Sequence, residues 1–351
     1  MKGLFDVITN FQIEGELGSI EPYGSGHINV TYLVVTDKKR YILQKINSNL
    51  FTDIDKLMNN IYLVTEHLKK KCPDKTVLTL VKTNDGKPYL NDNGKYYRVY
   101  DFIENSVCLQ IPRNTEEFYE SAVAFGDFAN MLNDFDATQL YEILPNFHNT
   151  VLRYQNFENA LEKNLSGRAH LAKDEIDFVL SRKSMADRIV SLIESGEMPL
   201  KVTHNDTKLN NVLLHKDTLK GLAVIDLDTV MPGSICYDFG DSIRFGCNSS
   251  YEDEEDLSKV YFKMDMFEAY VKGYLSSMPN ISDVEKEHLV DGAMLMTFEC
   301  GMRFLTDFLD GDTYFKVHKE NHNLYRCRTQ FKLVSEMEKN RDLMMEIVRK
   351  Y

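Results

Sequence analysis

The sequence lacks the cysteine spacings that indicate a metal site or a disulfide framework. It has six cysteines, and no two of them form a C-x-x-C pair. Structural zinc sites and small disulfide-bonded domains both depend on closely spaced cysteines. We therefore expect free thiols in a reducing cytosol at Cys72, Cys108, Cys236, Cys247, Cys300 and Cys327.

Long apolar runs are missing as well. No stretch approaches the roughly 20 consecutive apolar residues that a membrane-spanning helix needs. The first residues, Met1 to Asp6, meet acidic and polar side chains too early for a secretory signal peptide. We expect a cytoplasmic protein that does not enter a membrane.

The chain also has fewer basic than acidic residues. The chain has 41 Lys and Arg against 54 Asp and Glu, so its formal net charge is −13. A protein that neutralises nucleic-acid phosphates or lies on an anionic membrane needs the opposite balance. We therefore expect neither nucleic acid nor a membrane as a partner. A small anionic ligand is compatible with this charge, because a local basic pocket is enough to bind it.

The most informative stretch runs from Val202 to Asp241. It contains the pattern H-x-D-x-K-x-x-N between apolar segments, and after a turn an apolar strand leads to Asp226. These are the spacings of a kinase catalytic loop. The four patterned positions are His204, Asp206, Lys208 and Asn211.

The residue types of this stretch suit phosphoryl transfer, which needs a proton acceptor, a cation and oxygen ligands for magnesium. We expect Asp206 to contact the acceptor hydroxyl and accept its proton, and Lys208 to face the transferred phosphate. Asn211 and Asp226 offer the amide and carboxylate oxygens that Mg²⁺ prefers. Each piece alone also occurs in ordinary turns. Together, four typed positions and the following strand indicate a kinase site that uses ATP and Mg²⁺.

A glycine-containing hairpin precedes this stretch. Residues 20–35 read as strand, glycine turn and β-branched strand, which is a β-meander and not a strand-to-helix phosphate loop. A kinase glycine loop joins two antiparallel strands in this way, although a plain hairpin turn would look the same. We assign Gly24, Gly26, His27 and Asn29 to nucleotide binding.

The next strand departs from the pattern of kinases. Alternation places Ile42 and Gln44 on one face and sends Lys45, the expected phosphate anchor, to the other. Either Gln44 replaces the usual cation or a bulge lets Lys45 reach the site. We assign Ile42 and Gln44 to nucleotide binding, together with Tyr100 and Phe102 at the end of the last strand, where a hinge would meet adenine.

The period of the apolar residues divides the chain into two lobes. Residues 1–103 predict a nucleotide-binding lobe with a five-stranded antiparallel sheet and a helix over 53–71. Residues 104–351 predict a helical lobe for catalysis and acceptor binding. The fold class is α+β, with the bilobal protein-kinase-like arrangement. We expect helices from a cap at Asn114 or Thr115, near 157–165, and over 174–195, 257–276, 282–309 and 324–351.

Two acidic features follow the catalytic stretch. Asp238 lies where a carboxylate could hold the catalytic loop, through His204 or through backbone amides. The five consecutive acids of residues 252–256 predict a solvated first helical turn.

With these residues in view, the chain resembles the aminoglycoside phosphotransferase and choline kinase superfamily, and within it the N-acetylhexosamine 1-kinases. The resemblance covers nearly the whole chain, and that family also has Gln in the third strand. It implies ATP, Mg²⁺ and transfer to the anomeric hydroxyl of N-acetylglucosamine or N-acetylgalactosamine, with Arg303 and Tyr314 as further acceptor contacts. We also expect a monomer. The blocks that carry it are I-E-P-Y-G-S-G-H-I-N, R-Y-I-L-Q-K, V-T-H-N-D-T-K-L-N-N, I-D-L-D-T-V-M-P-G-S, D-F-G-D-S-I-R-F and E-C-G-M-R-F-L.

Two other functions remain open from the residues alone. One is a kinase of a different small alcohol, of the aminoglycoside, choline or homoserine type. The other is an inactive nucleotide-binding regulatory protein. Such a protein would be expected to have lost Asp206, Asn211 or Asp226, and all three are present.

Overall fold

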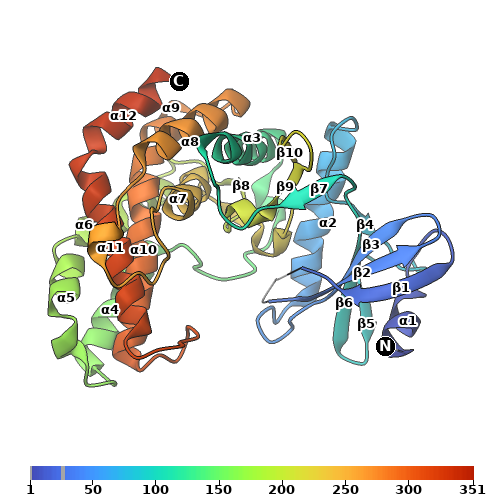
Figure 1. Cartoon of the computed structure of the whole chain (residues 1–351), viewed down its shortest axis with the longest axis horizontal. Helices are drawn as coiled ribbons and strands as arrows, with labels where there is room; N and C mark the ends of the chain where they lie inside the picture. Colours follow the sequence, from blue (N-terminus) through green and yellow to red (C-terminus); the bar gives the residue numbers. More distant parts are fainter. Residues whose placement is uncertain (1, 25–27) are drawn as a thin grey trace.

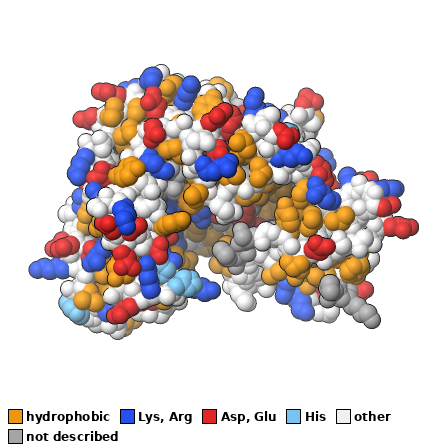
Figure 2. All heavy atoms as spheres, viewed as in Figure 1, with side chains coloured by type: hydrophobic (Ala, Val, Ile, Leu, Met, Phe, Trp, Pro, Cys, Tyr) orange, Lys and Arg blue, Asp and Glu red, His pale blue; other side chains and the backbone are white. Residues whose placement is uncertain are grey.

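The computed structural model describes residues 2–24 and 28–351. It has two parts, an antiparallel β-sheet with two helices and a larger, mainly helical part (Figure 1). The face shown in Figure 2 is hollowed between them. This arrangement confirms the α+β fold with a sheet lobe and a helical lobe. The boundary after residue 103 stays a prediction.

The sheet follows the strand order β1-β2-β3-β6-β4, and β5 pairs with β6. We predicted five strands, whereas the sheet has six, because the short segment Leu90–Asp92 also pairs with β6. The strands are β1 (Leu17–Pro22), β2 (Val30–Thr36), β3 (Arg40–Lys45), β4 (Leu80–Val81), β5 (Leu90–Asp92) and β6 (Lys95–Asp101).

The two faces of the sheet carry different side chains. Val34, Leu43 and Val99 on one face pack with helix α1 (Lys2–Ile8) into a small core. The opposite face packs against the main core of the molecule through Ile42 and Tyr100. The second face is therefore the one that looks toward the helical part.

Helix α2 (Ile54–Lys71) confirms the helix predicted over 53–71. The Asp53 carboxylate caps it by accepting the Lys56 N–H at 3.1 Å. The buried amide of Asn60 donates to the carbonyl oxygens of Tyr141 (2.8 Å) and Val230 (2.9 Å), both in the helical part. These bonds attach α2, and with it the sheet, to the segment that follows the catalytic residues.

The helical part consists of long helices and two small sheets, of which one has the order β10-β9-β7 and the other pairs β11 with β8. The helices are α3 (Thr115–Met131), α4 (Thr150–Lys163), α5 (Lys173–Leu180), α6 (Lys183–Glu194), α7 (Ile235–Gly246), α8 (Met264–Ser277), α9 (Asp283–Glu287), α10 (Leu289–Asp310), α11 (His322–Lys339) and α12 (Arg341–Lys350). The strands are β7 (Ser106–Cys108), β8 (Lys201–Thr203), β9 (Val212–His215), β10 (Gly221–Val224) and β11 (Met231–Gly233).

Several predicted helix boundaries need correction. The cap of α3 is Asn114, as predicted, but α4 begins seven residues earlier than predicted because Asn149 caps it by accepting the Leu152 N–H. The helix predicted over 174–195 is broken at Ser181 and Arg182. Its halves both contact α10, but α5 also packs on α11 and α6 also packs on α4. The helices predicted over 282–309 and 324–351 are likewise interrupted, at His288 and Asn340.

The acidic tract at residues 252–256 is a loop, so the predicted helical turn is wrong. Its carboxylates contact Lys and His side chains that are distant in the sequence. Asp253 lies 3.1 Å from His322 Nε2 and 3.2 Å from Lys319 Nζ. The helix expected from residue 257 starts only at Met264, because the preceding backbone pairs with residues 247–249.

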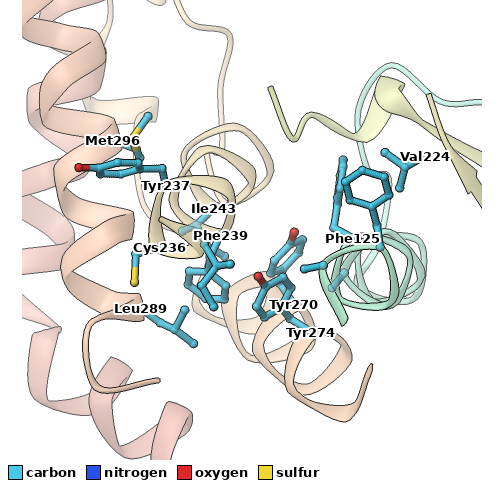
Figure 3. Packing of buried hydrophobic residues seen from close by; sticks show 14 of the residues in the cluster. Phe125, Val224, Cys236, Tyr237, Phe239, Ile243, Tyr270, Tyr274, Leu289 and Met296 are labelled. Carbon is cyan, nitrogen blue, oxygen red and sulfur yellow. The ribbon is translucent and has the colours of Figure 1, made fainter. Parts of the chain in front are cut away.

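The main core fixes α7, the helix that follows the catalytic stretch (Figure 3). Phe239 of α7 packs edge-on against Tyr270 and Tyr274 of α8. Gly240 touches the backbone of α10 so closely that a Cβ there would lie 2.3 Å from the Gly292 carbonyl oxygen. Helices α7 and α10 therefore meet backbone to backbone, which leaves α7 little freedom to move.

Helices that could cross a membrane, being both long and apolar enough, do not occur in residues 2–24 and 28–351.

Candidate active site

The catalytic loop connects two short pairs of antiparallel strands. Strand β8 precedes it and pairs with β11, while β9 follows it and pairs with β10. Val212 pairs with Val224, and the Ile225 N–H donates to the Asn211 carbonyl oxygen at 2.9 Å. Asn211 and Asp226 therefore lie at the same end of this hairpin.

Asp238, in the first turn of α7, holds the loop in shape. Its carboxylate oxygens accept the N–H groups of His204 and Asn205, each at 2.7 Å. This confirms the predicted contact of Asp238 with the loop backbone. Asn205 has a φ of 64°, a left-handed conformation that Asn adopts more readily than most residues. His204 Nε2 lies 2.9 Å from the Ile225 carbonyl oxygen, so the imidazole braces the loop against the strand that leads to Asp226.

Three of the predicted functional side chains meet at the centre of the loop. Lys208 Nζ lies 2.6 Å from Asp206 Oδ1. Asn211 Nδ2 donates to Asp206 Oδ2 (3.1 Å) and to its carbonyl oxygen (2.8 Å). Burial alone would lower the pKa of Lys208, but the carboxylates of Asp206 and Asp241 outweigh it and raise that pKa. Lys208 is therefore a cation beside the expected proton acceptor.

Asp226 follows β10 in a left-handed conformation, with a φ of 59°. Its side chain is exposed, but the surrounding protein removes part of its water, and with the nearby Asp228 carboxylate this raises the pKa of Asp226 to about 6. Such a carboxylate gains from a nearby cation. Because the amide nitrogen of Asn211 donates to Asp206, its oxygen is directed away from that bond. One accessible carboxylate and one amide oxygen fit the ligand preference of Mg²⁺.

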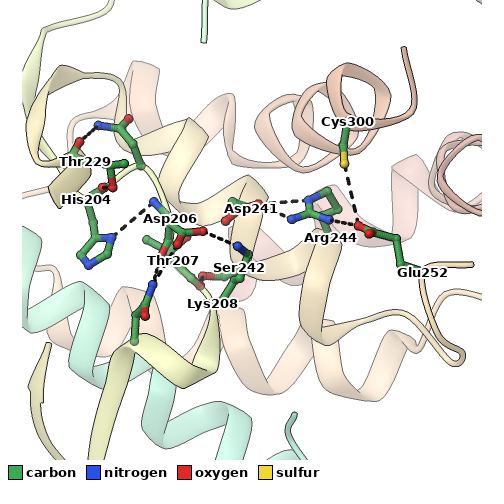
Figure 4. Close-up of polar contacts among 12 residues, drawn as sticks. His204, Asp206, Thr207, Lys208, Thr229, Asp241, Ser242, Arg244, Glu252 and Cys300 are labelled. Atoms are coloured by element: carbon green, nitrogen blue, oxygen red, sulfur yellow. Dashed lines mark hydrogen bonds and ion pairs between the residues drawn. The ribbon is translucent and has the colours of Figure 1, made fainter. Parts of the chain in front are cut away.

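A second set of polar contacts leads from the loop toward α10 (Figure 4). Arg244 Nη2 donates to Asp241 Oδ1 (2.8 Å), and Arg244 Nη1 donates to Glu252 Oε1 (3.2 Å). Cys300 Sγ of α10 lies 4.0 Å from the same Glu252 oxygen. Ser242 Oγ also donates to the Thr207 carbonyl oxygen (2.7 Å). Helix α7 thus links the catalytic loop to the helix that carries Arg303.

The sheet resolves the question of the third strand. The register of β3 with β2 and with β6 runs unbroken, with Gln44 opposite Arg98 and Lys45 opposite Tyr97. Because no bulge interrupts the alternation, Lys45 points to the face away from the helical part, and Gln44 shares its face with Ile42. The Gln44 side-chain oxygen accepts the Arg98 Nε–H at 2.9 Å. The cation that contacts Gln44 on this face is thus Arg98 of β6.

The other predicted nucleotide contacts lie at two edges of this face. Gly24 has a φ of +75° and open space around it, whereas Gly26 and His27 lie outside the described residues. Asn29 donates to Asp228 Oδ2 (2.6 Å) and accepts the Asn47 N–H (3.0 Å). It therefore joins the sheet part to the segment that follows Asp226.

At the opposite edge, Tyr100 is buried and packs into the main core. The Phe102 N–H donates to the Arg40 carbonyl oxygen at 3.1 Å, so it is not available to adenine. The Arg40 guanidinium lies 4.0 Å from the Phe102 ring centroid and pairs with Glu104. A hinge contact to adenine at Phe102 would therefore use the carbonyl group.

The two residues assigned to the acceptor by resemblance lie together. Arg303 Nη2 is 3.5 Å from Tyr314 Oη, and Arg303 Nη1 is 3.8 Å from Glu299 Oε1. Both line a cavity of about 350 Å³ between α4, α10 and the loop after α10. The other side chains of its wall are mostly polar: Arg153, Asn156, Asn159, Ala160, Lys163, Thr306, Asp307, Asp310, Thr313 and Phe315.

Sequence reasoning missed three residues that join the two parts. Arg98 pairs with Asp228, and Asn60 bonds the segment after β10. One signal was available for Arg98. It is a lone cation two residues before Tyr100, hence on the same face of the same strand. Its partner in a different lobe could not be read from local patterns.

The arrangement of lobes and loop is that of kinases that act on small molecules. The chain matches the phosphotransferase enzyme family over residues 19–274, more than half of its length, and therefore belongs to that family. An aminoglycoside phosphotransferase from Alicyclobacillus acidocaldarius superposes with a TM-score of 0.63 at 11% identity, with 99% of this chain and 95% of that chain covered.

Two further structures show the same fold. A microcompartment-associated aminopropanol kinase superposes with a TM-score of 0.56 at 14% identity, covering 98% of each chain. A spectinomycin phosphotransferase in complex with ADP and spectinomycin gives 0.53 at 11% identity, covering 95% of this chain and 98% of that chain. At these identities the likeness concerns the fold, and it confirms the predicted protein-kinase-like arrangement.

Proposed function

We propose that the protein transfers the γ-phosphoryl group of ATP to the anomeric hydroxyl of an N-acetylhexosamine, N-acetylglucosamine or N-acetylgalactosamine, and forms the sugar 1-phosphate. The observation that carries the kinase part of the proposal is the contact of Asp206 with Lys208 and Asn211 in a loop held by Asp238. The family supports phosphotransfer, and the resemblance of the sequence blocks supports the choice of acceptor.

The chemistry assigns one task to each side chain. The hydroxyl oxygen of the sugar bonds to the γ-phosphorus, the bond from that phosphorus to the β–γ bridging oxygen breaks, and ADP leaves. Asp206 orients the hydroxyl and takes its proton, while Lys208 stabilises the charge on the transferred group. When bound by Asn211 and Asp226, Mg²⁺ would neutralise phosphate oxygens.

The cavity beside Arg303 supports a neutral, hydroxylated acceptor. Arg153, Lys163 and Arg303 all contribute positive charge to its wall. Of the two acids there, Asp307 is buried and committed to backbone N–H groups of the following loop. A cationic acceptor would meet a largely basic wall, whereas sugar hydroxyls can accept from these donors.

A kinase of another small alcohol is the second candidate. The aminopropanol kinase and the spectinomycin phosphotransferase have the same fold and act on aminopropanol and on spectinomycin, as their names say. An inactive protein is disfavoured by the intact group of Asp206, Asn211 and Asp226.

An ADP-release screen tests the proposal. The purified protein with Mg·ATP is offered N-acetylglucosamine, N-acetylgalactosamine, glucose, galactose, choline, ethanolamine and an aminoglycoside, and Asp206→Asn serves as the blank. We expect the two N-acetylhexosamines to give the highest kcat/KM. A preference for an amino alcohol or aminoglycoside would replace the sugar by the second candidate, and no turnover with any acceptor would contradict both.

A further inference from the structure

Arg98 is a buried cation on the sheet face where kinases have a third-strand lysine and this chain has Gln44. Its role is not explained by the predicted site. It is among the largest fully buried side chains, with 1% relative exposure. It lies on the sheet face that carries Ile42, Gln44 and Tyr100, the face we assign to the nucleotide. Buried arginines need acceptors for their donors, so its surroundings indicate what it holds.

Two hydrogen-bond acceptors fix the orientation of the Arg98 guanidinium. Gln44 Oε1 accepts from Nε at 2.9 Å, and the Asp228 carboxylate accepts from Nη1 in a short ion pair. Among the residues that the structure describes, no acceptor contacts Nη2. Asp228 is itself held by the amide of Asn29 at 2.6 Å. The guanidinium is therefore fixed on two sides and has donors to spare.

The position of Arg98 relates it to the catalytic carboxylates. Asp228, which pairs with Arg98, stands two residues after Asp226, the expected metal ligand. Lys45 points to the opposite face and cannot serve here. Arg40 shares the face of Arg98 but pairs with Glu104 at the hinge end. Arg98 is thus the cation of this sheet face that lies nearest the metal ligands.

We propose that Arg98 binds the phosphate chain of the nucleotide in place of a third-strand lysine, with Gln44 and Asp228 as the residues that position it. Pairing with Asp228 does not disqualify it, because the corresponding lysine of protein kinases also binds phosphates while paired with a carboxylate. A planar guanidinium suits this task, since it can keep two protein partners and still donate to a phosphate. The inference rests on the proposed nucleotide site and not on the identity of the acceptor.

The test compares a nucleotide that has phosphates with one that has none. Affinities for Mg·ADP and for adenosine are measured by calorimetry for the natural protein, Arg98→Met, Arg98→Lys, and Arg98→Met combined with Gln44→Lys. Lys45→Met is the matched control, because it removes a cation from the neighbouring strand β3, opposite Tyr97, on the other face of the sheet. Thermal unfolding of each variant reports whether it folds.

We expect Arg98→Met to weaken Mg·ADP about tenfold to a hundredfold, the loss typical of a charge-assisted hydrogen bond, with adenosine affected far less. Gln44→Lys should restore part of the loss, and Lys45→Met should change neither affinity. Arg98→Lys keeps the charge but loses the planar set of guanidinium donors. It should therefore weaken Mg·ADP binding selectively as well, but to a smaller degree.

A ratio of Mg·ADP to adenosine affinity that stays at the natural value in Arg98→Met would overturn the proposal. If Arg98→Met does not fold, an unchanged ratio in Arg98→Lys would overturn it equally. A selective loss in Lys45→Met would assign the role to Lys45 instead. If the natural protein itself binds no Mg·ADP, the proposed kinase function fails, which is a different outcome from an unchanged ratio.

Discussion

The catalytic loop and the acceptor end of α10 are held in very different ways. Around the loop, Asp238 and Asp206 each make several short contacts within buried or half-buried surroundings. At the acceptor end, Tyr314 is 71% exposed, and its contact with Arg303 is a long one at 3.5 Å. The groups that we assign to transfer are preformed. Of the two groups that we assign to the acceptor, Arg303 lies on α10 and Tyr314 is an exposed side chain of the loop that follows.

This difference separates two kinds of experiment. Changes at the catalytic loop should alter whether phosphate is transferred, with every acceptor alike. Changes at the end of α10 should alter which molecule is accepted, and leave the nucleotide unaffected. The following variants test that separation, from the largest expected effect to the smallest.

Replacing Asp206 by Asn should lower kcat by about two to four orders of magnitude, because it removes the proton acceptor and little else. The affinity for Mg·ADP should stay close to natural, since the contact to Asn211 is kept in part. Steady-state kinetics and calorimetry on the same sample check both. Turnover close to that of the natural protein would contradict the assignment of Asp206 as the proton acceptor.

Replacing Asp226 by Ala should remove most of the dependence of nucleotide affinity on magnesium, because it deletes an anionic oxygen ligand. The measurement is ADP binding with magnesium and with excess chelator, for both proteins. The natural protein should bind much more tightly with magnesium, and the variant should show little difference. An equal magnesium effect in the two proteins would exclude Asp226 as a ligand.

Replacing Arg303 by Ala should raise the KM of the acceptor about tenfold to a hundredfold and leave the KM of ATP nearly unchanged. The reason is that Arg303 lines the cavity that we assign to the acceptor and is not among the residues that we assign to the nucleotide. Arg349→Ala, on an exposed residue near the end of α12, is the matched control. Equal rises in both KM values would indicate that Arg303 has only a structural role, through its contact with Glu299.

Replacing Asp307 by Asn should have the smallest effect. Its carboxylate accepts the N–H groups of Thr313 and Tyr314 at 2.8 Å and that of Phe315 at 2.9 Å, so it shapes the loop that carries Tyr314. We expect a rise of roughly threefold to tenfold in acceptor KM, within the range of one neutral hydrogen bond, and an unchanged KM for ATP. Asp342→Asn, an exposed acid in α12, is the control. A larger effect on ATP than on the acceptor would contradict this role.

Much of the catalytic half could be predicted because its residues are close in sequence. The spacing of Asp206, Lys208 and Asn211 is set by one loop, and the cap at Asn114 and the helix over 53–71 follow from local side-chain chemistry. The contact of Asp238 with the loop was also within reach, since both lie in one stretch.

The rest depends on partners that local patterns do not reveal. Arg98 acquires its importance from Asp228, 130 residues away in the chain. The acidic tract is a loop whose Asp253 contacts Lys319, just before α11, and His322, the first residue of α11. Helix breaks such as Ser181 separate halves that also pack on different helices, α11 for α5 and α4 for α6, and propensity does not encode such packing.

The most direct measurement of the central claim identifies which hydroxyl receives the phosphate. The anomeric hydroxyl is the most acidic on a reducing sugar, so a carboxylate such as Asp206 need take its proton only late in a loose transition state. Phosphate on that oxygen closes the ring and removes the reducing end. We predict that phosphorylation of N-acetylglucosamine consumes one reducing end for each ADP released, and that mild acid hydrolyses the product. A product that still reduces copper and resists that acid would show that the protein is not a sugar 1-kinase.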